Sequence, residues 1–229
     1  MKIRKVIKSF KRKTSPPDWH NLRSVHPISR TFGLDRGTPI DRYYIENFLR
    51  KESAHIQGVV LEIAESTYSK TFGHNVNQYE VLHTKPGNNV TIVGDLTDLT
   101  TLPAGKVDCF ICTQTFNFIY DIQAAVKGAY HLLKPGGIFL VTLAGLSQIS
   151  RYDMDRWGDY WRFTSLSAKK LFADQFGESQ VEVKAHGNVL AAIAFLEGIS
   201  VEELTREELD FVDEDYQMIL TVKAQKMAS

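Results

Sequence analysis

Short apolar runs recur along the chain from about residue 58 onward, and segments with helical periodicity separate them. β-Branched and aromatic residues fill the middles of these runs. Several runs are apolar on consecutive residues, as strands buried on both faces must be. The runs predict strands at residues 58–64, 76–82, 90–94, 107–113, 137–143, 181–186 and 216–224. This alternation predicts an α/β fold, with an open, mostly parallel sheet and helices on both faces.

Helical periodicity marks four further segments. "PIDRYYIENFLRKES" (39–53) has Pro39 near its start and Asp41 as the expected N-cap. "DIQAAVKGAYHLL" (121–133) is ended by Lys134-Pro135-Gly136-Gly137, and "SLSAKKLFADQ" (165–175) is the third segment. We expect an acidic helix at about 201–210 as well.

Composition limits the class of protein. The chain has 229 residues, 43% of them hydrophobic and 24% charged, which suits one globular domain with an added cap. No apolar stretch approaches the ~20 residues of a membrane span, and the first residues lack a signal-peptide core, so we expect a cytoplasmic protein. Cys109 and Cys112 lie in one predicted strand with odd spacing, which points them to opposite faces. We therefore expect buried free thiols and no metal site.

A net charge of zero conceals a basic N-terminus. Residues 1–13, "MKIRKVIKSFKRK", hold seven Lys or Arg and no acid, so the rest of the chain has 20 basic and 27 acidic residues. Ile3, Val6, Ile7 and Phe10 have helical spacing, which suits either a solvated arm or an amphipathic helix on anionic lipid. No nucleic-acid partner is expected, because the basic surface does not continue into the body of the chain. We assign residues 1–25 to the arm and its connector, and 26–229 to one domain.

Acidic residues follow the predicted strands at the positions where open α/β sheets bind ligands. Glu80 comes eighteen residues after Glu62, where a strand-tip acid can accept hydrogen bonds from a ribose. Asp95 follows Gly94 at the third strand and can accept from an adenine amine. The spacing therefore favours a nucleoside ligand at the carboxyl ends of the strands.

The segment from about 58 to 143 resembles class I S-adenosylmethionine-dependent methyltransferases. The resemblance rests on "VVLEIAE", Glu80, "GDLTDLTTLP", the long segment beginning "VDCFICTQ" and the "LLKPGG" turn. "FGLDRGTPIDRYYIENFL" and "SQISRYDMDRWGDYWRFTSLSAKKLF" resemble a bacterial type 11 subgroup that is associated with glycan-modifying glycosyltransferases. The resemblance implies a three-layer α/β/α, doubly wound fold. Its sheet would have seven mostly parallel strands with an antiparallel last strand, and a cap helix would precede it.

The resemblance also implies a site for S-adenosylmethionine. Its expected residues are Glu62, Ile63, Ala64 and Glu65 beneath the methionine moiety, Glu80 at the ribose, Asp95 and Leu96 at the adenine, and Thr113 and Gln114 at the sulfonium. The family usually has a glycine-rich turn where this chain has Ala64, Glu65 and Ser66. Ala64 preserves a close approach to the ligand provided that its φ is negative.

The segment after the fifth strand is the expected acceptor site. Its aromatic, acidic and arginine side chains suit a small-molecule or glycan-linked acceptor methylated at oxygen. The expected contacts are Tyr43, Arg151, Trp157, Tyr160, Trp161 and Arg162, with Asp155 or Asp153 as the base. His83 and His186 are alternative bases, and a structural lid is the alternative role for the segment.

Two other functions stay open at this point. A non-catalytic binding protein could keep the fold with a degenerate cofactor turn. A nicotinamide-dependent oxidoreductase would need a pyrophosphate-binding glycine loop, which the sequence lacks.

Overall fold

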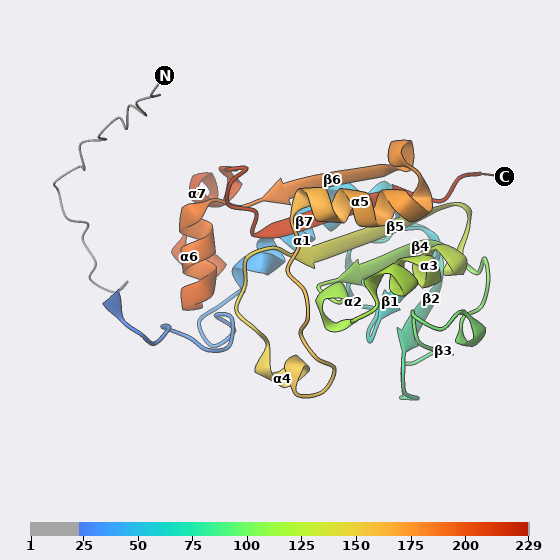
Figure 1. Cartoon of the computed structure of the whole chain (residues 1–229), viewed down its shortest axis with the longest axis horizontal. Helices are drawn as coiled ribbons and strands as arrows, with labels where there is room; N and C mark the ends of the chain where they lie inside the picture. Colours follow the sequence, from blue (N-terminus) through green and yellow to red (C-terminus); the bar gives the residue numbers. More distant parts are fainter. Residues whose placement is uncertain (1–22, 229) are drawn as a thin grey trace, which may run out of the picture.

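The computed structural model describes residues 23–228, which form one α/β domain around a mixed sheet (Figure 1). The strands of this part of the chain are β1 (Gly58–Ile63), β2 (Val76–His83), β3 (Ile92–Val93), β4 (Val107–Thr113), β5 (Leu133–Ala144), β6 (Val181–His186) and β7 (Ile219–Gln225). Their order across the sheet is β3-β2-β1-β4-β5-β7-β6. Strands β1 to β5 pair in parallel, whereas β7 runs antiparallel to both β5 and β6. The predicted seven-stranded sheet with an antiparallel last strand is therefore confirmed.

Helices cover both faces of the sheet, and others lie beyond the carboxyl ends of its strands. In the described part they are α1 (Ile40–Lys51), α2 (Thr67–Phe72), α3 (Ile122–Leu132), α4 (Arg151–Met154), α5 (Ser165–Phe176), α6 (Val189–Glu197) and α7 (Arg206–Asp210). Figure 1 shows α3 and α5 on one face, α1 on the other, and α6 and α7 beyond the carboxyl ends of the strands.

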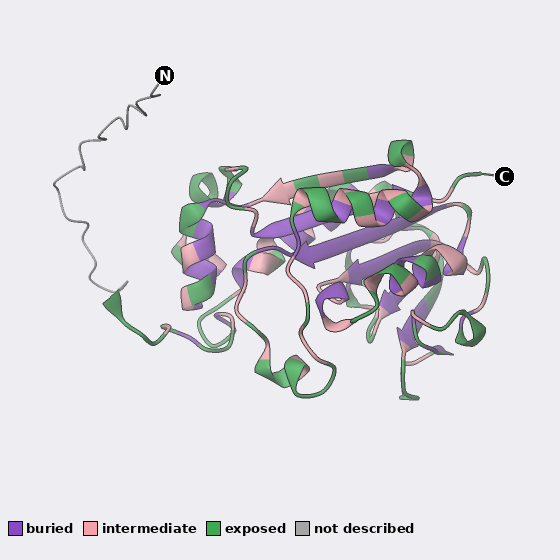
Figure 2. Cartoon of the chain, viewed as in Figure 1, coloured by how far each residue is buried: buried purple, intermediate pink, exposed green. Residues whose placement is uncertain are grey.

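Figure 2 shows that the central strands of the sheet are mostly buried. Strand periodicity divides their buried residues between the two faces. Val60 packs in a cluster with residues of α1 and α2, while its neighbour Leu61 packs with residues of α3 and α5. Cys109 and Cys112 divide in the same way, one in each cluster, and both are buried free thiols. This follows from the alternation of side chains along a strand and confirms the prediction for the cysteine pair.

Local capping explains where several helices begin. Asp121 accepts from the backbone N–H of Ala124 at the start of α3, and Thr164 forms a capping box with Ser167 at α5. Asn188 caps α6, a helix that the sequence analysis did not predict, because its residues are almost all apolar and show little helical periodicity. The helices expected at 121–133 and 165–175 are otherwise confirmed.

Four boundaries differ from the predictions. Pro39 precedes α1, and Asp41 lies in the first turn without capping it. The acidic segment 201–210 is split into a 3₁₀ turn and α7, because Thr205 starts a new helix. Strand β3 covers only two residues, and β5 begins at Leu133, within the expected helix end.

The basic arm and most of its connector lie outside the described residues, so its helical prediction is not addressed by this structure. Within residues 23–228, no helix is both long and apolar enough to cross a bilayer.

Candidate functional site

A cavity of about 510 Å³ lies at the carboxyl ends of β1, β4 and β5. Its walls come from the turn after β1, the segment after β4, the loop after β5, the start of α1 and Phe195 of α6. A cavity of this size falls within the range of small-molecule sites. Its position is the one that parallel α/β sheets use for ligands.

The turn after β1 forms the floor of this cavity. Glu62 is buried and accepts from the backbone N–H groups of Tyr68 (3.1 Å) and Ser69 (2.7 Å), so it holds the start of α2 against the strand. Burial raises the pKa of Glu62, while these hydrogen bonds oppose the rise. Ile63, Ala64 and Glu65 also line the cavity. The four residues predicted for this turn therefore all line the cavity.

Ala64 has a φ of +66°, in the left-handed region that favours glycine. The assumption of a negative φ at this position is wrong. The turn keeps the backbone path of a glycine although its residue is alanine, which costs about 1–2 kcal/mol in an L-residue.

Two further cavity residues share this conformation. Gln114, directly after β4, has a φ of +47°, and Phe32 has a φ of +59°. The backbone N–H of Gln114 donates to the carbonyl of Thr142 at 3.0 Å, which fixes the strand tip, and Thr113 lines the cavity beside it. Left-handed residues without glycine concentrate at functional sites, because the surrounding structure must hold them there.

Enclosed acceptor oxygens without partners lie in two of the cavity-lining residues. Oδ1 of Asp41 and Oδ1 of Asn117 are enclosed, and neither receives a hydrogen bond from any described residue. Burial raises the pKa of Asp41, and the adjacent guanidinium of Arg42 opposes this only in part. Buried acceptors are normally satisfied, so these two oxygens are available to hydrogen-bond donors that enter the cavity.

Arginine side chains hold two other walls of the cavity. Arg42 donates to the hydroxyl of Tyr68 and lies over its ring. Arg162 binds Asp159 and donates to the carbonyl of Gln148 at 2.9 Å, which ties the loop after β5 together. Burial would raise the pKa of Asp159, but the hydrogen bond and charge of Arg162 outweigh it and lower that pKa.

The cavity carries an excess of formal negative charge. Five acids line it, namely Asp41, Glu62, Glu65, Asp153 and Asp159, against the two cations Arg42 and Arg162. The difference of three negative charges favours a ligand with positive charge or with hydrogen-bond donors. Within residues 23–228, no group of His, Cys, Asp or Glu has a metal-binding arrangement.

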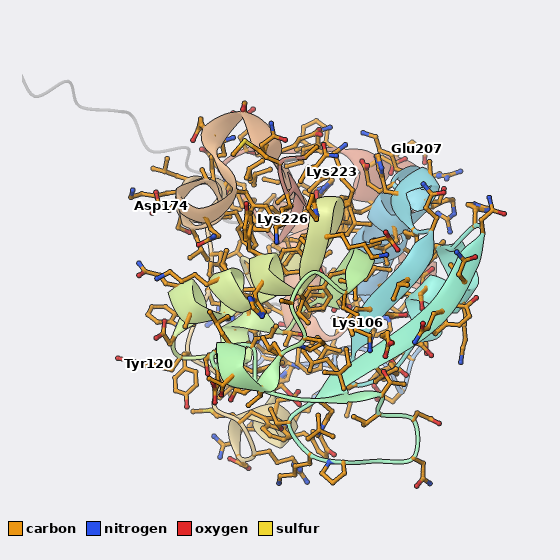
Figure 3. The ribbon with its side chains drawn as sticks, turned by 90° about the vertical axis from the view of Figure 1, so that its right-hand side faces the viewer. Lys106, Tyr120, Asp174, Glu207, Lys223 and Lys226 are labelled. Atoms are coloured by element: carbon orange, nitrogen blue, oxygen red, sulfur yellow. The ribbon has the colours of Figure 1, made fainter. Side chains whose placement is uncertain are left out.

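Glu80 does not lie where the sequence analysis placed it. The strand continues through Val81 and Leu82 to His83, so Glu80 is buried inside β2 and not at its tip. Its Oε1 pairs with the ammonium of Lys106 at 2.8 Å, and Lys106 is labelled in Figure 3. Glu80 also does not line the cavity. The predicted ribose contact is therefore corrected: this carboxylate is internal to the sheet.

The nucleoside end of the expected site is only partly formed. Asp95 follows β3 as predicted and is exposed, with Oδ1 accepting from the backbone and hydroxyl of Thr97, both at 2.8 Å. Leu96 is buried beside it. Neither residue lines the cavity. At the tip of β2, the ring of Trp157 meets His83 edge-on, with centroids 5.8 Å apart.

The expected acceptor residues separate into different environments. Only Asp153 and Arg162 line the cavity, and Asp153 accepts from Ser150 Oγ at 2.6 Å. Asp155 is exposed and pairs with Arg151 at 3.0 Å, so the structure does not enclose it among aromatic side chains. Its expected role as the base is not supported by this position.

Aromatic residues of the same set serve mainly to fix the loop. Trp161 packs against the core and donates through Nε1 to the carbonyl of Ile119 at 3.1 Å. Tyr160 stacks edge-on against Tyr120. Tyr43 lines a separate cavity of about 180 Å³, beside α1, and donates to Asp210 at 2.6 Å. This cavity also includes His186, whose pKa is lowered mainly by burial.

The sequence analysis missed several residues that the fold brings to the cavity. Asp41 was assigned to a helix cap, and Arg42, Phe32 and Asn117 were not considered as cavity residues, whereas Asp159 belongs to the segment expected to contact the acceptor. The position of Asn117, four residues beyond the end of β4, is the one signal that could have indicated it. The others reach the cavity through tertiary packing.

The chain was compared with models of protein families, with curated proteins and with solved structures. Residues 55–141, from just before β1 into β5, match the model of a family described as a methyltransferase domain. No curated protein matched the chain.

Many solved structures share the fold at low sequence identity. An S-adenosylmethionine-dependent methyltransferase from Mesorhizobium loti is 17% identical, with a TM-score of 0.51, and the match covers 78% of this chain and 95% of that one. The N-methyltransferase NodS from Bradyrhizobium japonicum WM9, in complex with S-adenosyl-L-homocysteine, is 11% identical, with a TM-score of 0.51 and coverages of 87% and 94%. The [4+2]-cyclase SpnF is 14% identical, with a TM-score of 0.52 and coverages of 90% and 88%.

These similarities show that the chain has the Rossmann-like methyltransferase fold. At such identities they concern the fold alone, and a cyclase among the neighbours shows that the fold does not fix the reaction.

Proposed function

We propose that the protein is an S-adenosylmethionine-dependent methyltransferase whose cavity holds the methyl donor and a hydroxyl-bearing acceptor side by side. The observation that supports this most is the floor of the cavity. Ala64 keeps a left-handed backbone at the tip of β1, inside the segment that matches the methyltransferase domain. Bound S-adenosylmethionine would supply a methyl group already activated by its sulfonium.

The methionine end of the cofactor fits the residues that are present. Ala64 leaves space beneath the ligand, and Glu65 and Asp153 offer carboxylates to an ammonium and a sulfonium. At the nucleoside end, exposed Asp95 is the available acceptor, because Glu80 is paired with Lys106. We therefore propose Ile63, Ala64, Glu65, Thr113 and Gln114 as cofactor contacts, with Asp95 at the nucleoside.

The unpartnered oxygens support a hydroxyl acceptor, either a small molecule or one linked to a glycan. A hydroxyl can donate to Oδ1 of Asn117 or of Asp41, which are the enclosed acceptors of this cavity. A sugar hydroxyl has a high pKa and benefits from a base. Asp41 suits that role, because its raised pKa brings it closer to neutrality and its Oδ1 is unpaired.

A non-catalytic ligand-binding protein is a second candidate. The specific observation in its favour is that Trp157 and Lys85 pack together at the tip of β2, where the nucleoside would lie. In that case the fold would retain a pocket without methyl transfer.

Isothermal titration calorimetry with S-adenosylmethionine tests the proposal. The full chain should bind the cofactor, and Ala64→Leu should abolish binding by filling the floor of the cavity. Ala104→Leu, the same change at an exposed turn residue outside the cavity, should bind like the parent. No binding by the parent would overturn the methyltransferase proposal.

The acceptor is then sought by mass spectrometry. Glycan and lipid extracts incubated with protein and cofactor should contain a species heavier by one methylene. Asp41→Asn should lower kcat for that acceptor and leave the cofactor dissociation constant unchanged. If the parent binds the cofactor but transfers no methyl group to any extract, the non-catalytic candidate is favoured.

A further inference from the structure

Exposed apolar side chains lie on two segments, 23–37 and 145–160, and both segments contribute residues to the wall of the cavity. We call these side chains the apolar rim. Its members are Val25, Ile28, Leu34, Leu146, Ile149, Tyr152, Met154 and Trp157, each at least 39% exposed. Water-exposed apolar groups gathered around a site are typical of a surface that docks on a partner or a membrane.

Residues of both segments adjoin the cavity. Leu34 lines the cavity, as do Ser147, Gln148 and Ser150, which alternate with Leu146 and Ile149 along the second loop. Gln148 also contacts the carbonyl of Arg30 at 3.5 Å. Figure 1 shows α4 and the first described residues on the same side of the molecule, beyond the carboxyl ends of the strands.

Basic side chains are interspersed with the apolar rim. Lys85 lies over the ring of Trp157, and Arg156 lies over the ring of Tyr152. Within residues 23–228, no carboxylate pairs with Arg30 or Arg156. Aromatic, aliphatic and basic side chains together suit the interface of an anionic bilayer, where rings sit at headgroup depth and cations meet lipid phosphates.

The chain that precedes the described residues is strongly basic. The described part begins at Arg23, and seven Lys or Arg lie within residues 1–13. The nine residues between residue 13 and Arg23 span at most about 35 Å, so the basic arm is tethered within that distance of the first rim segment.

Resting on the proposed function, we infer that the apolar rim docks on an anionic lipid surface and that the acceptor is a lipid-anchored hydroxyl compound. The cavity would then receive the acceptor head group from the bilayer, while its lipid chain stays in the membrane. A second copy of the chain or a protein partner on the rim would not require the basic residues.

Vesicle flotation of the full chain tests this inference. The parent should float with vesicles of phosphatidylcholine and phosphatidylglycerol, but not with phosphatidylcholine alone. The double variant Leu146→Ser/Met154→Ser should reduce the partition coefficient about tenfold or more. Neither residue lines the cavity, so cofactor binding by calorimetry should be unchanged.

A matched control uses equally exposed residues outside the rim. Leu99 and Met227 are 44% and 60% exposed, against 40% and 39% for Leu146 and Met154. Leu99→Ser/Met227→Ser should float like the parent. If the rim variant also floats like the parent, or if the parent does not bind anionic vesicles, the docking inference is wrong.

Two further outcomes are decisive. A rim variant that loses cofactor affinity would show that these side chains close over the ligand and do not face a membrane. With tritiated methyl donor and a membrane extract, the label should enter the lipid fraction, and label found only in the aqueous fraction would overturn the acceptor class.

Absence of cofactor binding by the parent would instead refute the proposed function and leave the vesicle result interpretable.

Discussion

Individual residues at this cavity hold conformations and charges that stability alone would not select. Ala64 and Gln114 have left-handed backbones at the tips of neighbouring strands β1 and β4. Asp41 has an enclosed oxygen without a partner. Each feature costs free energy in the ligand-free protein, and such costs concentrate where a ligand is bound.

Replacing Ala64 by glycine should stabilise the protein. Its φ of +66° strains alanine but not glycine, and this gain exceeds the extra chain entropy that glycine loses on folding. We expect the free energy of unfolding to rise by about 0.5–1 kcal/mol in urea titrations. Ala104→Gly, at a residue outside the left-handed region, should lower it slightly. If Ala64→Gly and Ala104→Gly lowered the free energy of unfolding equally, the strain inferred at Ala64 would be contradicted.

Asp41 should make stability depend on pH. Burial raises its pKa in the folded state above the unfolded value of 3.8, so the folded protein holds this proton more tightly. The contribution is therefore fully present below about pH 4 and is lost as pH rises through the folded pKa. Asp41→Asn, which resembles the protonated acid, should match the parent near pH 3 and exceed it at pH 7. A difference in unfolding free energy that stays constant with pH would exclude this explanation.

Residue positions were predictable where the strand tip itself defines them. Glu62 to Glu65 and Thr113 with Gln114 directly end strands, and they do line the cavity. Glu80 was misplaced because Val81, Leu82 and His83 continue β2 for three residues beyond it, which buries the acid. The place of Asp41 in the cavity could not be predicted, since tertiary packing brings it there together with Phe32 and Phe195, which come from other parts of the chain.

Among the helices and strands, close packing of α3 against the loop after β3 fixes the position of that loop. A Cβ on Gly128 would lie 2.0 Å from the carbonyl oxygen of Leu96. Only glycine allows this approach, which holds Leu96 and therefore the position of Asp95. The helix thus carries a residue of poor helix propensity for a packing reason.

Substituting Gly128 should reverse the usual effect of alanine in a helix. Gly→Ala in an exposed helix interior stabilises by about 1 kcal/mol. Here the clash involves a backbone oxygen, so Gly128→Ala should destabilise by roughly 1–3 kcal/mol in thermal or urea unfolding. Lys127→Ala, on the exposed side of the same helix, should change stability little. A more stable Gly128→Ala would show that the loop relaxes freely.

Elements with a clear hydrophobic period were predicted well, and the others were not. The strands at β1, β2, β4 and β6 and the helices α3 and α5 follow from pattern. Helix α6 was missed because apolar residues surround its axis, although Asn188 and Gly198 mark its ends. The break between the 3₁₀ turn and α7 depends on the reciprocal cap of Thr205 and Glu208, which competes with a continuous helix.

The distribution of charge is uneven over the whole molecule. Residues 1–13 carry seven positive charges, and the remainder carries a net charge of −7. An acidic body would be repelled by anionic lipid without such an arm. The arm and the apolar rim should therefore contribute separately to membrane binding.

Deletion of residues 1–13 should weaken binding to anionic vesicles without affecting the fold. Each basic residue near an anionic surface contributes about 1 kcal/mol, and salt screens this attraction. Sedimentation should fall strongly at low ionic strength and less at high ionic strength, whereas the melting temperature and cofactor affinity should not change. Equal sedimentation of both forms at low salt would dispose of the role of the arm.

Cys109 and Cys112 lie in different layers of the core, one on each side of the sheet. Their thiols can therefore report separately on local opening of the two helical layers. Cys109 lies among residues of α1 and α2, and Cys112 among those of α3 and α5. Burial raises the pKa of both thiols, that of Cys112 to about 12. Thiol reagents therefore react only after the layer above each sulfur opens. In Cys112→Ala or Cys109→Ala, only one thiol remains, so its labelling rate measures how often the layer above it opens. A bound ligand should lower the labelling rate in the layer that it contacts.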